Sequence, residues 1–213
     1  MSSSAWLNVP LTDYEGHMLS PEVAQLDVLA VLFREVLDFC RPPSVAILGI
    51  AGGNGVDQID PNITRRIAGV DVNPDYLAAV RHRFPALNDI ELYRADLAQQ
   101  MVVMPPVALV HAALIFEHAG VERCLDNAVL MVAPGGTLSV VLQLPSPMAA
   151  GVGASPYASL AGLKPNFALV DPGWMKETLE SRGFQLAQQT LRPLAAGKSF
   201  WMGVFQRTAA GVA

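Results

Sequence analysis

Charged residues are scarce in this chain of 213 residues, since they make up 15% of it, against roughly 25% in an average soluble protein. Runs of Lys or Arg are missing and the formal net charge is −5, so we expect no nucleic-acid partner and no anionic membrane surface as a partner. The chain is nevertheless 52% hydrophobic, which excludes a disordered polypeptide, because such chains lack the apolar surface that offsets chain entropy.

Long apolar runs and paired cysteines are missing as well. The longest apolar stretch, residues 101–116, contains two prolines and His111 and is shorter than the ~20 residues of a membrane-spanning helix. The N-terminal residues have neither a basic segment nor an apolar core, so we expect no signal peptide. Cys40 and Cys124 lie far apart without CxxC or His-rich neighbours. We therefore expect a cytoplasmic protein with no disulfide scaffold and no metal site.

Short apolar segments alternate with segments of helical periodicity along the whole chain. The pattern predicts strands at 44–50, 67–72, 90–94, 107–112, 137–142, 185–190 and 200–206. It predicts helices at 20–40, 75–84, 121–132 and 172–182. Three of these helices start at a pair of a capping residue and a proline, namely Ser20-Pro21, Asn73-Pro74 and Asp171-Pro172. Such alternation favours an open α/β sheet. The short connection between the last two strands requires an antiparallel hairpin at one edge.

A glycine loop and two aspartates follow the first three predicted strands. The loop Gly49–Gly55 (GIAGGNG) follows a strand and is expected to precede a helix, so it can present backbone N–H groups to a ligand. It differs from the dinucleotide fingerprint, because Gln58 stands where GxGxxG needs its last glycine. Asp71 can accept hydrogen bonds from a ribose diol, and Asp96 can accept one from an adenine amine. Together they indicate one nucleoside across three strand ends; turn packing and helix capping remain the alternatives.

With these motifs the chain resembles the class I S-adenosylmethionine-dependent methyltransferases. The matching pieces, in family order, are AILGIAGGNG, GVDVNPDYL, LYRADL, ALIFEH and APGGTLSVV. The resemblance implies a Rossmann-like α/β fold with a seven-stranded, mostly parallel sheet of order 3-2-1-4-5-7-6, strand 7 antiparallel and helices on both faces. It also implies a single domain over residues 1–213 that uses S-adenosylmethionine as cofactor.

The resemblance further implies a set of cofactor-binding residues. The loop would contact the methionine portion, Asp71 the ribose and Asp96 the adenine. The full set is Gly49, Ala51, Gly53, Gly55, Asp71, Val72, Asp96, Leu97 and Ala112. The chain departs from the family at Gly49, where an acid is usual, and at Ala51, where glycine is usual. Either another acid substitutes, with Glu15 and Glu117 as candidates, or cofactor affinity falls.

Catalytic candidates lie in the N-terminal arm and after the fourth predicted strand. Residues 1–42 are expected to form a lid arm and a helix, with Tyr14 at the cofactor and His17 facing the acceptor; a surface arm is the alternative. His118 is a candidate base, with helix capping as its alternative. The Pro-, Gly- and Ser-rich segment 144–170 is expected to cover the substrate.

Three functions remain open at this point. The first is methyl transfer by in-line displacement to a small-molecule acceptor, with a homodimer left open. The second is a catalytically silent binding or partner subunit, which the glycine at position 49 favours. The third is a nicotinamide-dependent reductase, which Gln58 disfavours and which gives Asp96 no role. His111, inside an apolar strand, is expected to be a hydrogen-bonded core residue.

Overall fold

The structure is a computed structural model that describes residues 4–87, 89–146, 155–194 and 197–208. Its α-helices are α1 Leu11–Leu19, α2 Leu26–Cys40, α3 Pro74–Arg83, α4 Phe116–Ala119, α5 Glu122–Met131 and α6 Pro172–Ser181. Short 3₁₀ helices are η1 Ala5–Asn8, η2 Val56–Gln58 and η3 Ala158–Asn166. The strands are β1 Ser44–Leu48, β2 Arg66–Asp71, β3 Glu91–Arg94, β4 Val107–Ala113, β5 Val132–Gln143, β6 Phe184–Pro193 and β7 Ser199–Arg207.

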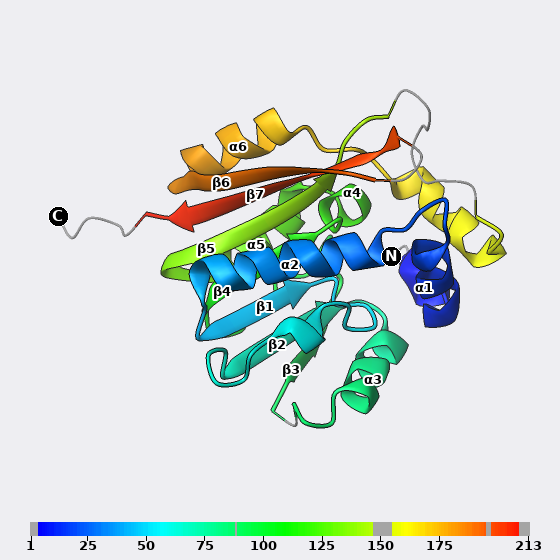
Figure 1. Ribbon diagram of the computed structural model, residues 1–213, viewed down its shortest axis with the longest axis horizontal. Coiled ribbons are helices and arrows are strands. Elements are labelled where there is room, and N and C mark those ends of the chain that lie inside the picture. Colours follow the sequence, from blue (N-terminus) through cyan, green and yellow to red (C-terminus); the bar gives the residue numbers. More distant parts are fainter. Residues whose placement is uncertain (1–3, 88, 147–154, 195–196, 209–213) are drawn as a thin grey trace.

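The strands form one seven-stranded sheet in the order β3-β2-β1-β4-β5-β7-β6. Neighbouring strands from β3 to β5 pair in parallel, whereas β7 pairs antiparallel with both β5 and β6 (Figure 1). The predicted sheet and its edge hairpin are thus confirmed. Because β7 runs against the others, its first residues lie at the same edge of the sheet as the carboxyl ends of β1 to β5.

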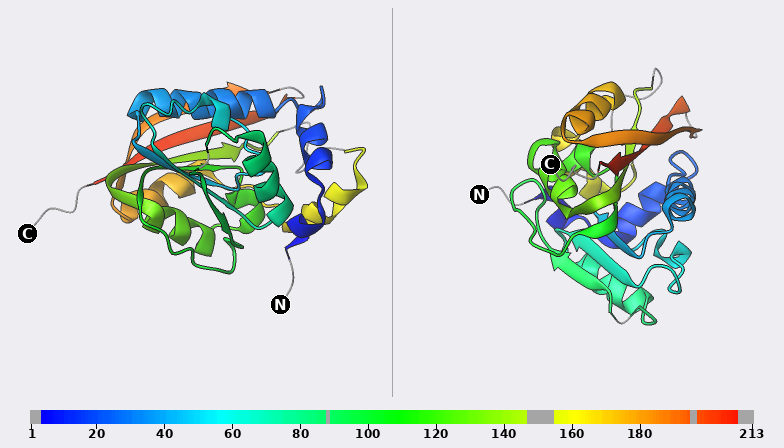
Figure 2. Two further views of the ribbon diagram at one scale, coloured as in Figure 1. Left: turned by 90° about the horizontal axis from the view of Figure 1, so that it is seen from below. Right: turned by 90° about the vertical axis from the view of Figure 1, so that its left-hand side faces the viewer.

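Helices cover both faces of the sheet, as the left view of Figure 2 shows. On one face, α2 and α3 pack through residues such as Leu32, Phe33 and Val80. On the other face, α4, α5 and α6 pack through residues such as Leu125 and Met175. A parallel sheet between two helical layers needs apolar residues on both sides of each strand, which accounts for the low content of charge. No helix among the described residues is long and apolar enough to cross a membrane.

Local predictions were right at two caps and wrong at a third. Asn73 accepts a hydrogen bond from the backbone N–H of Asp75 at 3.0 Å, and Asp171 accepts one from Trp174 at 2.7 Å. The helix predicted from Ser20, however, begins only at Leu26. Ser20 instead ends α1, because its N–H and its hydroxyl both donate to the carbonyl of His17.

Two further local predictions were wrong. The glycine loop does not open a helix: after it comes η2, a single 3₁₀ turn. Strand β5 begins at Val132 rather than at the predicted residue 137, and the β4–β5 register shifts between Val107 and Leu109. The left-handed backbone of Gly135 (φ +71°) accommodates this irregularity within the strand.

Candidate functional site

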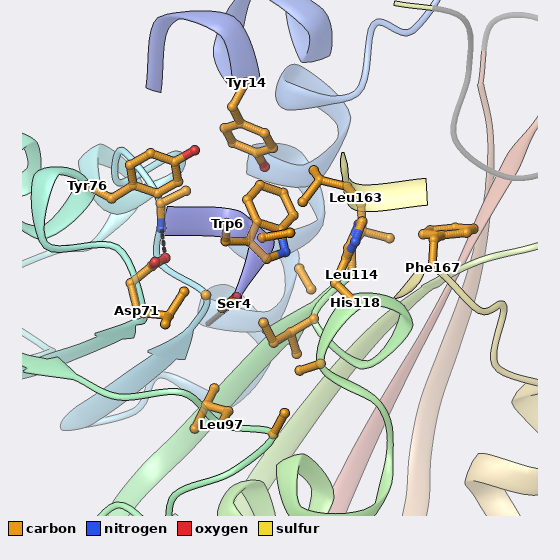
Figure 3. Close-up of a pocket in the computed structure, with 18 of the residues that line it drawn as sticks. Ser4, Trp6, Tyr14, Asp71, Tyr76, Leu97, Leu114, His118, Leu163 and Phe167 are labelled. Carbon is orange, nitrogen blue, oxygen red and sulfur yellow. Dashed lines mark hydrogen bonds between the residues drawn. The ribbon is translucent and has the colours of Figure 1, made fainter. Parts of the chain in front are cut away.

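A cavity of about 500 Å³ lies at the carboxyl edge of the sheet, within the roughly 300–1,000 Å³ range of small-molecule sites. Residues at successive strand ends line it: Gly49 follows β1, Asp71 ends β2, Ala113 ends β4 and Gln143 ends β5. Asp96 lies two residues beyond β3 and also lines it. The parallel strand order therefore gathers residues that are distant in sequence around one space (Figure 3).

Asp71 ties the glycine loop to the end of β2. One carboxylate oxygen accepts the backbone N–H of Ala51 at 3.0 Å, the dashed bond in Figure 3, and the other accepts the N–H of Asn73 at 2.9 Å. Asp71 is only 8% exposed. Burial raises the pKa of its carboxyl, and the backbone hydrogen bonds oppose that rise. The residue thus holds the loop in place and keeps a carboxylate at the cavity.

Gly49 adopts a backbone that disfavours a side chain. Its φ is +68°, in the left-handed region, and a Cβ there would lie 2.9 Å from Cδ1 of Ile115. An acid at this position would be strained, because the left-handed backbone brings Cβ too close to the following carbonyl. The bond from Ala51 to Asp71 orients the loop instead.

Neither candidate for a replacement acid lines the cavity. Glu15 pairs with Arg83, which also donates to the carbonyl oxygen of Gly52 at 3.1 Å. Glu117 lies behind the cavity wall, where its Oε1 accepts the backbone N–H of Gln143 at 2.8 Å. Its Oε2 is buried without a hydrogen-bond partner among the described residues. Burial raises the pKa of Glu117 to about 7.

Six of the nine predicted cofactor-binding residues line the cavity, namely Gly49, Ala51, Asp71, Val72, Asp96 and Leu97. Gly53, Gly55 and Ala112 do not. A Cβ on Gly53 would lie 2.5 Å from Phe84, so this glycine allows close packing beneath the loop. Gly55 packs in the same way against Phe33 of α2. Ala112 is fully buried among the apolar residues on the α5 side, and the next residue on β4, Ala113, lines the cavity in its place.

Asp96 combines its place at the cavity with a local structural role. Its Oδ1 accepts the backbone N–H of Ala98 at 2.9 Å, and its Oδ2 accepts the side-chain amide of Gln99 at 3.3 Å. Asp96 therefore has the capping role that the sequence left open as an alternative, and it also lines the cavity.

The N-terminal arm and η3 together form a roof over the cavity. The side-chain amide of Asn73 donates to the carbonyl of Trp6 at 2.9 Å, and the hydroxyl of Tyr76 donates to that of Val9 at 3.0 Å. These bonds hold the arm against β2 and α3. Val9 packs in turn on Leu160 and Leu163 of η3. Of the segment expected to cover the substrate, residues 147–154 lie outside the described residues.

All three catalytic candidates line the cavity. Burial, with the charges of Asp71 and Glu15, raises the pKa of Tyr14 above its ordinary range. Burial and the nearby Lys198 lower the pKa of His17. His118 has edge contacts with Trp6 (centroids 5.0 Å apart) and Phe167 (5.1 Å), and burial lowers its pKa to about 4. Tyr14 and both histidines are therefore neutral at pH 7.

Comparison with solved structures identifies the architecture. The N-methyltransferase NodS from Bradyrhizobium japonicum, solved with S-adenosylhomocysteine, aligns with a TM-score of 0.65 at 15% identity over 86% of this chain and 87% of that one. Magnesium protoporphyrin IX methyltransferase from Synechocystis, solved with S-adenosylmethionine, aligns with a TM-score of 0.62 at 13% identity over 92% and 83%. The chain has the class I methyltransferase fold. No protein-family model and no curated protein sequence matches it.

Within this methyltransferase fold, sequence reasoning missed three polar residues that line the cavity: Gln25, Gln143 and Lys198. The available signal was the short β6–β7 connection, which brings Lys198 to the same edge as the glycine loop. His111 is the buried core residue expected, with Nδ1 3.2 Å from the hydroxyl of Ser139. Among the described residues, no three His, Cys, Asp or Glu side chains gather closely enough to hold a metal ion.

Proposed function

We propose that the protein transfers a methyl group from S-adenosylmethionine to a small-molecule acceptor. The observation that carries this proposal is the placement of Asp71 and Asp96 at consecutive strand ends, on a cavity of about 500 Å³, in a methyltransferase fold. The nicotinamide-dependent alternative leaves Asp96 without a ligand contact.

The donor groups of the cavity suit an adenosyl ligand. The carboxylate of Asp71 would accept hydrogen bonds from the ribose diol, and that of Asp96 would accept one from the adenine amine. The loop backbone at Gly49 and Ala51, which carries little side-chain bulk, would lie against the methionine portion. Bound S-adenosylmethionine supplies a methyl group on a positively charged sulfur, ready for in-line displacement by a nucleophile.

The remaining lining residues would bind and orient the acceptor. The roof of the arm and η3 excludes water, and such positioning and desolvation can supply much of the rate of methyl transfer. His17, neutral at pH 7, can accept the proton that an oxygen or nitrogen nucleophile releases. Tyr14 donates its hydroxyl proton to a ligand but is a poor base, because its pKa is raised. His118 supports the aromatic wall beside Trp6.

Titration calorimetry with S-adenosylhomocysteine tests the cofactor assignment. We expect binding by the native protein and about tenfold to a hundredfold weaker binding by Asp71→Asn, because hydrogen bonds to charged groups contribute about 1.5–3 kcal/mol each. Asp75→Asn is the matched control, since it removes the same charge from an exposed residue in the first turn of α3. Absence of binding by the native protein, or binding of NADH alone, would overturn the assignment.

A silent binding subunit is the second candidate, and the glycine at position 49 favours it. Neither Glu15 nor Glu117 replaces the missing acid at the cavity. Radiolabelled methyl transfer to a broad panel of small nucleophiles distinguishes the two functions. Transfer to any acceptor excludes the silent subunit, whereas tight binding of S-adenosylmethionine without transfer to any acceptor supports it.

A further inference from the structure

Four buried polar side chains that line the cavity have no part in the adenosyl contacts proposed above. They are 4–7% exposed and come from four separate segments: His17 of α1, Gln25 before α2, Gln143 at the end of β5 and Lys198 before β7. We call these four residues the polar recess. A buried polar group beside a cavity is costly unless a partner meets it.

The strand order places the polar recess opposite the two aspartates. Asp96 and Asp71 follow β3 and β2 at one side of the sheet, whereas Gln143 and Lys198 belong to β5 and β7. Gln143 pairs with Phe200, two residues beyond Lys198, so these two side chains share one corner of the edge. With strands about 4.8 Å apart, three strand positions separate β2 from β5. The cavity therefore has an acidic end and a basic end.

Hydrogen bonding within the polar recess is incomplete. Nδ1 of His17 is buried and has no hydrogen-bond partner among the described residues. The amides of Gln25 and Gln143 meet only at 3.5 Å, the outer limit of a hydrogen bond. Buried side-chain nitrogens of native proteins nearly always have a partner, so the unpaired one indicates that a ligand completes the set.

The charge of the polar recess indicates an anion. Lys198 supplies one positive charge, while the amides and the neutral His17 supply uncharged hydrogen-bonding groups. The acids that line the cavity, Asp71 and Asp96, belong to its other end, and Glu117 is bonded to the backbone of Gln143 behind the wall and does not line the cavity. One cation with neutral donors matches a single negative charge, as on a carboxylate, better than the double charge of a phosphate ester.

Apolar side chains that line the same cavity describe the rest of the ligand. Met18, Val23, Leu114, Leu163 and Phe167 all line the cavity. An apolar wall with a few convergent polar groups is typical of sites that orient a largely hydrophobic molecule by one polar end.

We propose that the methyl acceptor is an apolar carboxylic acid whose carboxylate binds in the polar recess, against Lys198 and His17. The role of this acid as the methyl acceptor rests on the proposed methyl transfer, whereas the anion site itself does not. Lys198 is thereby a specificity-determining residue, and it favours acids over their neutral amides.

Ligand-observed NMR on the full chain tests the site with matched pairs of acid and amide. The probes are benzoate, phenylacetate, 3-phenylpropionate and octanoate, each beside its carboxamide, at pH 7.5 with and without S-adenosylhomocysteine. We expect at least one acid to bind about tenfold or more tightly than its amide. Lys198→Met should abolish that preference. Lys176→Met, which removes a charge from the exposed surface of α6, should retain it.

The outcomes separate this inference from the proposed function. Equal binding of acids and amides, or no binding of any probe by the native protein, overturns the carboxylate site even if S-adenosylhomocysteine binds. A preference for acids without S-adenosylhomocysteine binding overturns the methyltransferase proposal and leaves the site. Lys198→Arg keeps the charge and should keep most of the preference, so a loss in Lys198→Met alone is assigned to charge. Circular dichroism of each variant checks that it is folded.

Discussion

Replacing Glu117 by glutamine is expected to stabilise the protein above pH 7. Glu117 is 1% exposed, and one of its carboxylate oxygens accepts the backbone N–H of Gln143. The other oxygen has no partner among the described residues. Glutamine keeps an oxygen that can accept that N–H and fills nearly the same volume, so the substitution removes mainly the buried charge.

The magnitude follows from the pKa of Glu117, which burial raises from 4.5 to about 7. The folded protein then holds this proton more tightly than the unfolded chain does. Its free energy of unfolding therefore falls as the pH rises from 4.5 to about 7, and this loss persists above pH 7. At 1.36 kcal/mol for each unit of pKa shift, the loss approaches about 3 kcal/mol. At pH 5 the same relation gives a loss of about 1 kcal/mol in the free energy of unfolding.

Urea unfolding of native protein and Glu117→Gln at pH 5 and pH 8 measures this loss. His111 and His118, whose pKa values burial lowers to about 4, give stability that is present at high pH and lost as the pH falls below 6.5. Because both proteins contain them, their contribution cancels in the difference. Glu177→Gln, on the exposed surface of α6, is the matched control for the substitution itself. An equal difference between native and variant at both pH values would refute a buried carboxylate of raised pKa.

Three further predictions concern the loop and the roof. Gly49→Ala should lower the free energy of unfolding by more than Gly135→Ala, since both have positive φ at a cost of about 1–2 kcal/mol but only the first meets a neighbour; equal losses in urea would contradict the crowding. Arg83→Met removes the ion pair with Glu15 and should change stability by less than about 1 kcal/mol, yet it should speed amide exchange in α1. Unchanged exchange would show that this ion pair does not hold the arm. Trp6→Ala should raise the pKa of His118 toward 6.5 in an NMR titration, and a pKa still near 4 would mean that the arm does not shield this ring.

The sheet and the acidic end of the cavity could be predicted because their signals are local. Each strand is a short apolar run between turn residues, and parallel strands must bring their carboxyl ends to one edge. Asp71 and Asp96, which follow two of these strands, are therefore expected at that edge. The caps at Asn73 and Asp171 could also be predicted from the sequence. A side-chain oxygen at the N-cap accepts a hydrogen bond from a backbone N–H in the first helical turn that has no partner within the helix.

The sequence predicted an N-terminal lid arm and a covering segment at 144–170, but not how the roof is held, because contacts that are distant in sequence hold it together. Helix α1 has a weak apolar pattern, and it is secured by η3: the hydroxyl of Ser159 donates to the carboxylate of Asp13 at 2.6 Å. A side chain on Gly16 would collide with Tyr157. Lys198 was missed although the short β6–β7 connection, together with the strand order, places it at this edge of the sheet.

The alternation of side chains along β4 explains why Ala112 does not line the cavity. On a strand, successive side chains point to opposite faces, so moving the end of β4 by one residue exchanges a buried position for a cavity position. Ala113, with Leu114 and Ile115 beyond it, lines the cavity instead.

The start of helix α2 touches both the glycine loop and the polar recess. The carbonyl of its first residue, Leu26, accepts the side-chain amide of Asn54 in the glycine loop at 2.9 Å. The preceding residue, Gln25, lies in the polar recess. Both contacts come from the start of α2, so a ligand that shifts the start of this helix acts on the glycine loop and on the polar recess together. By reciprocity, each ligand then changes the affinity for the other by the same factor.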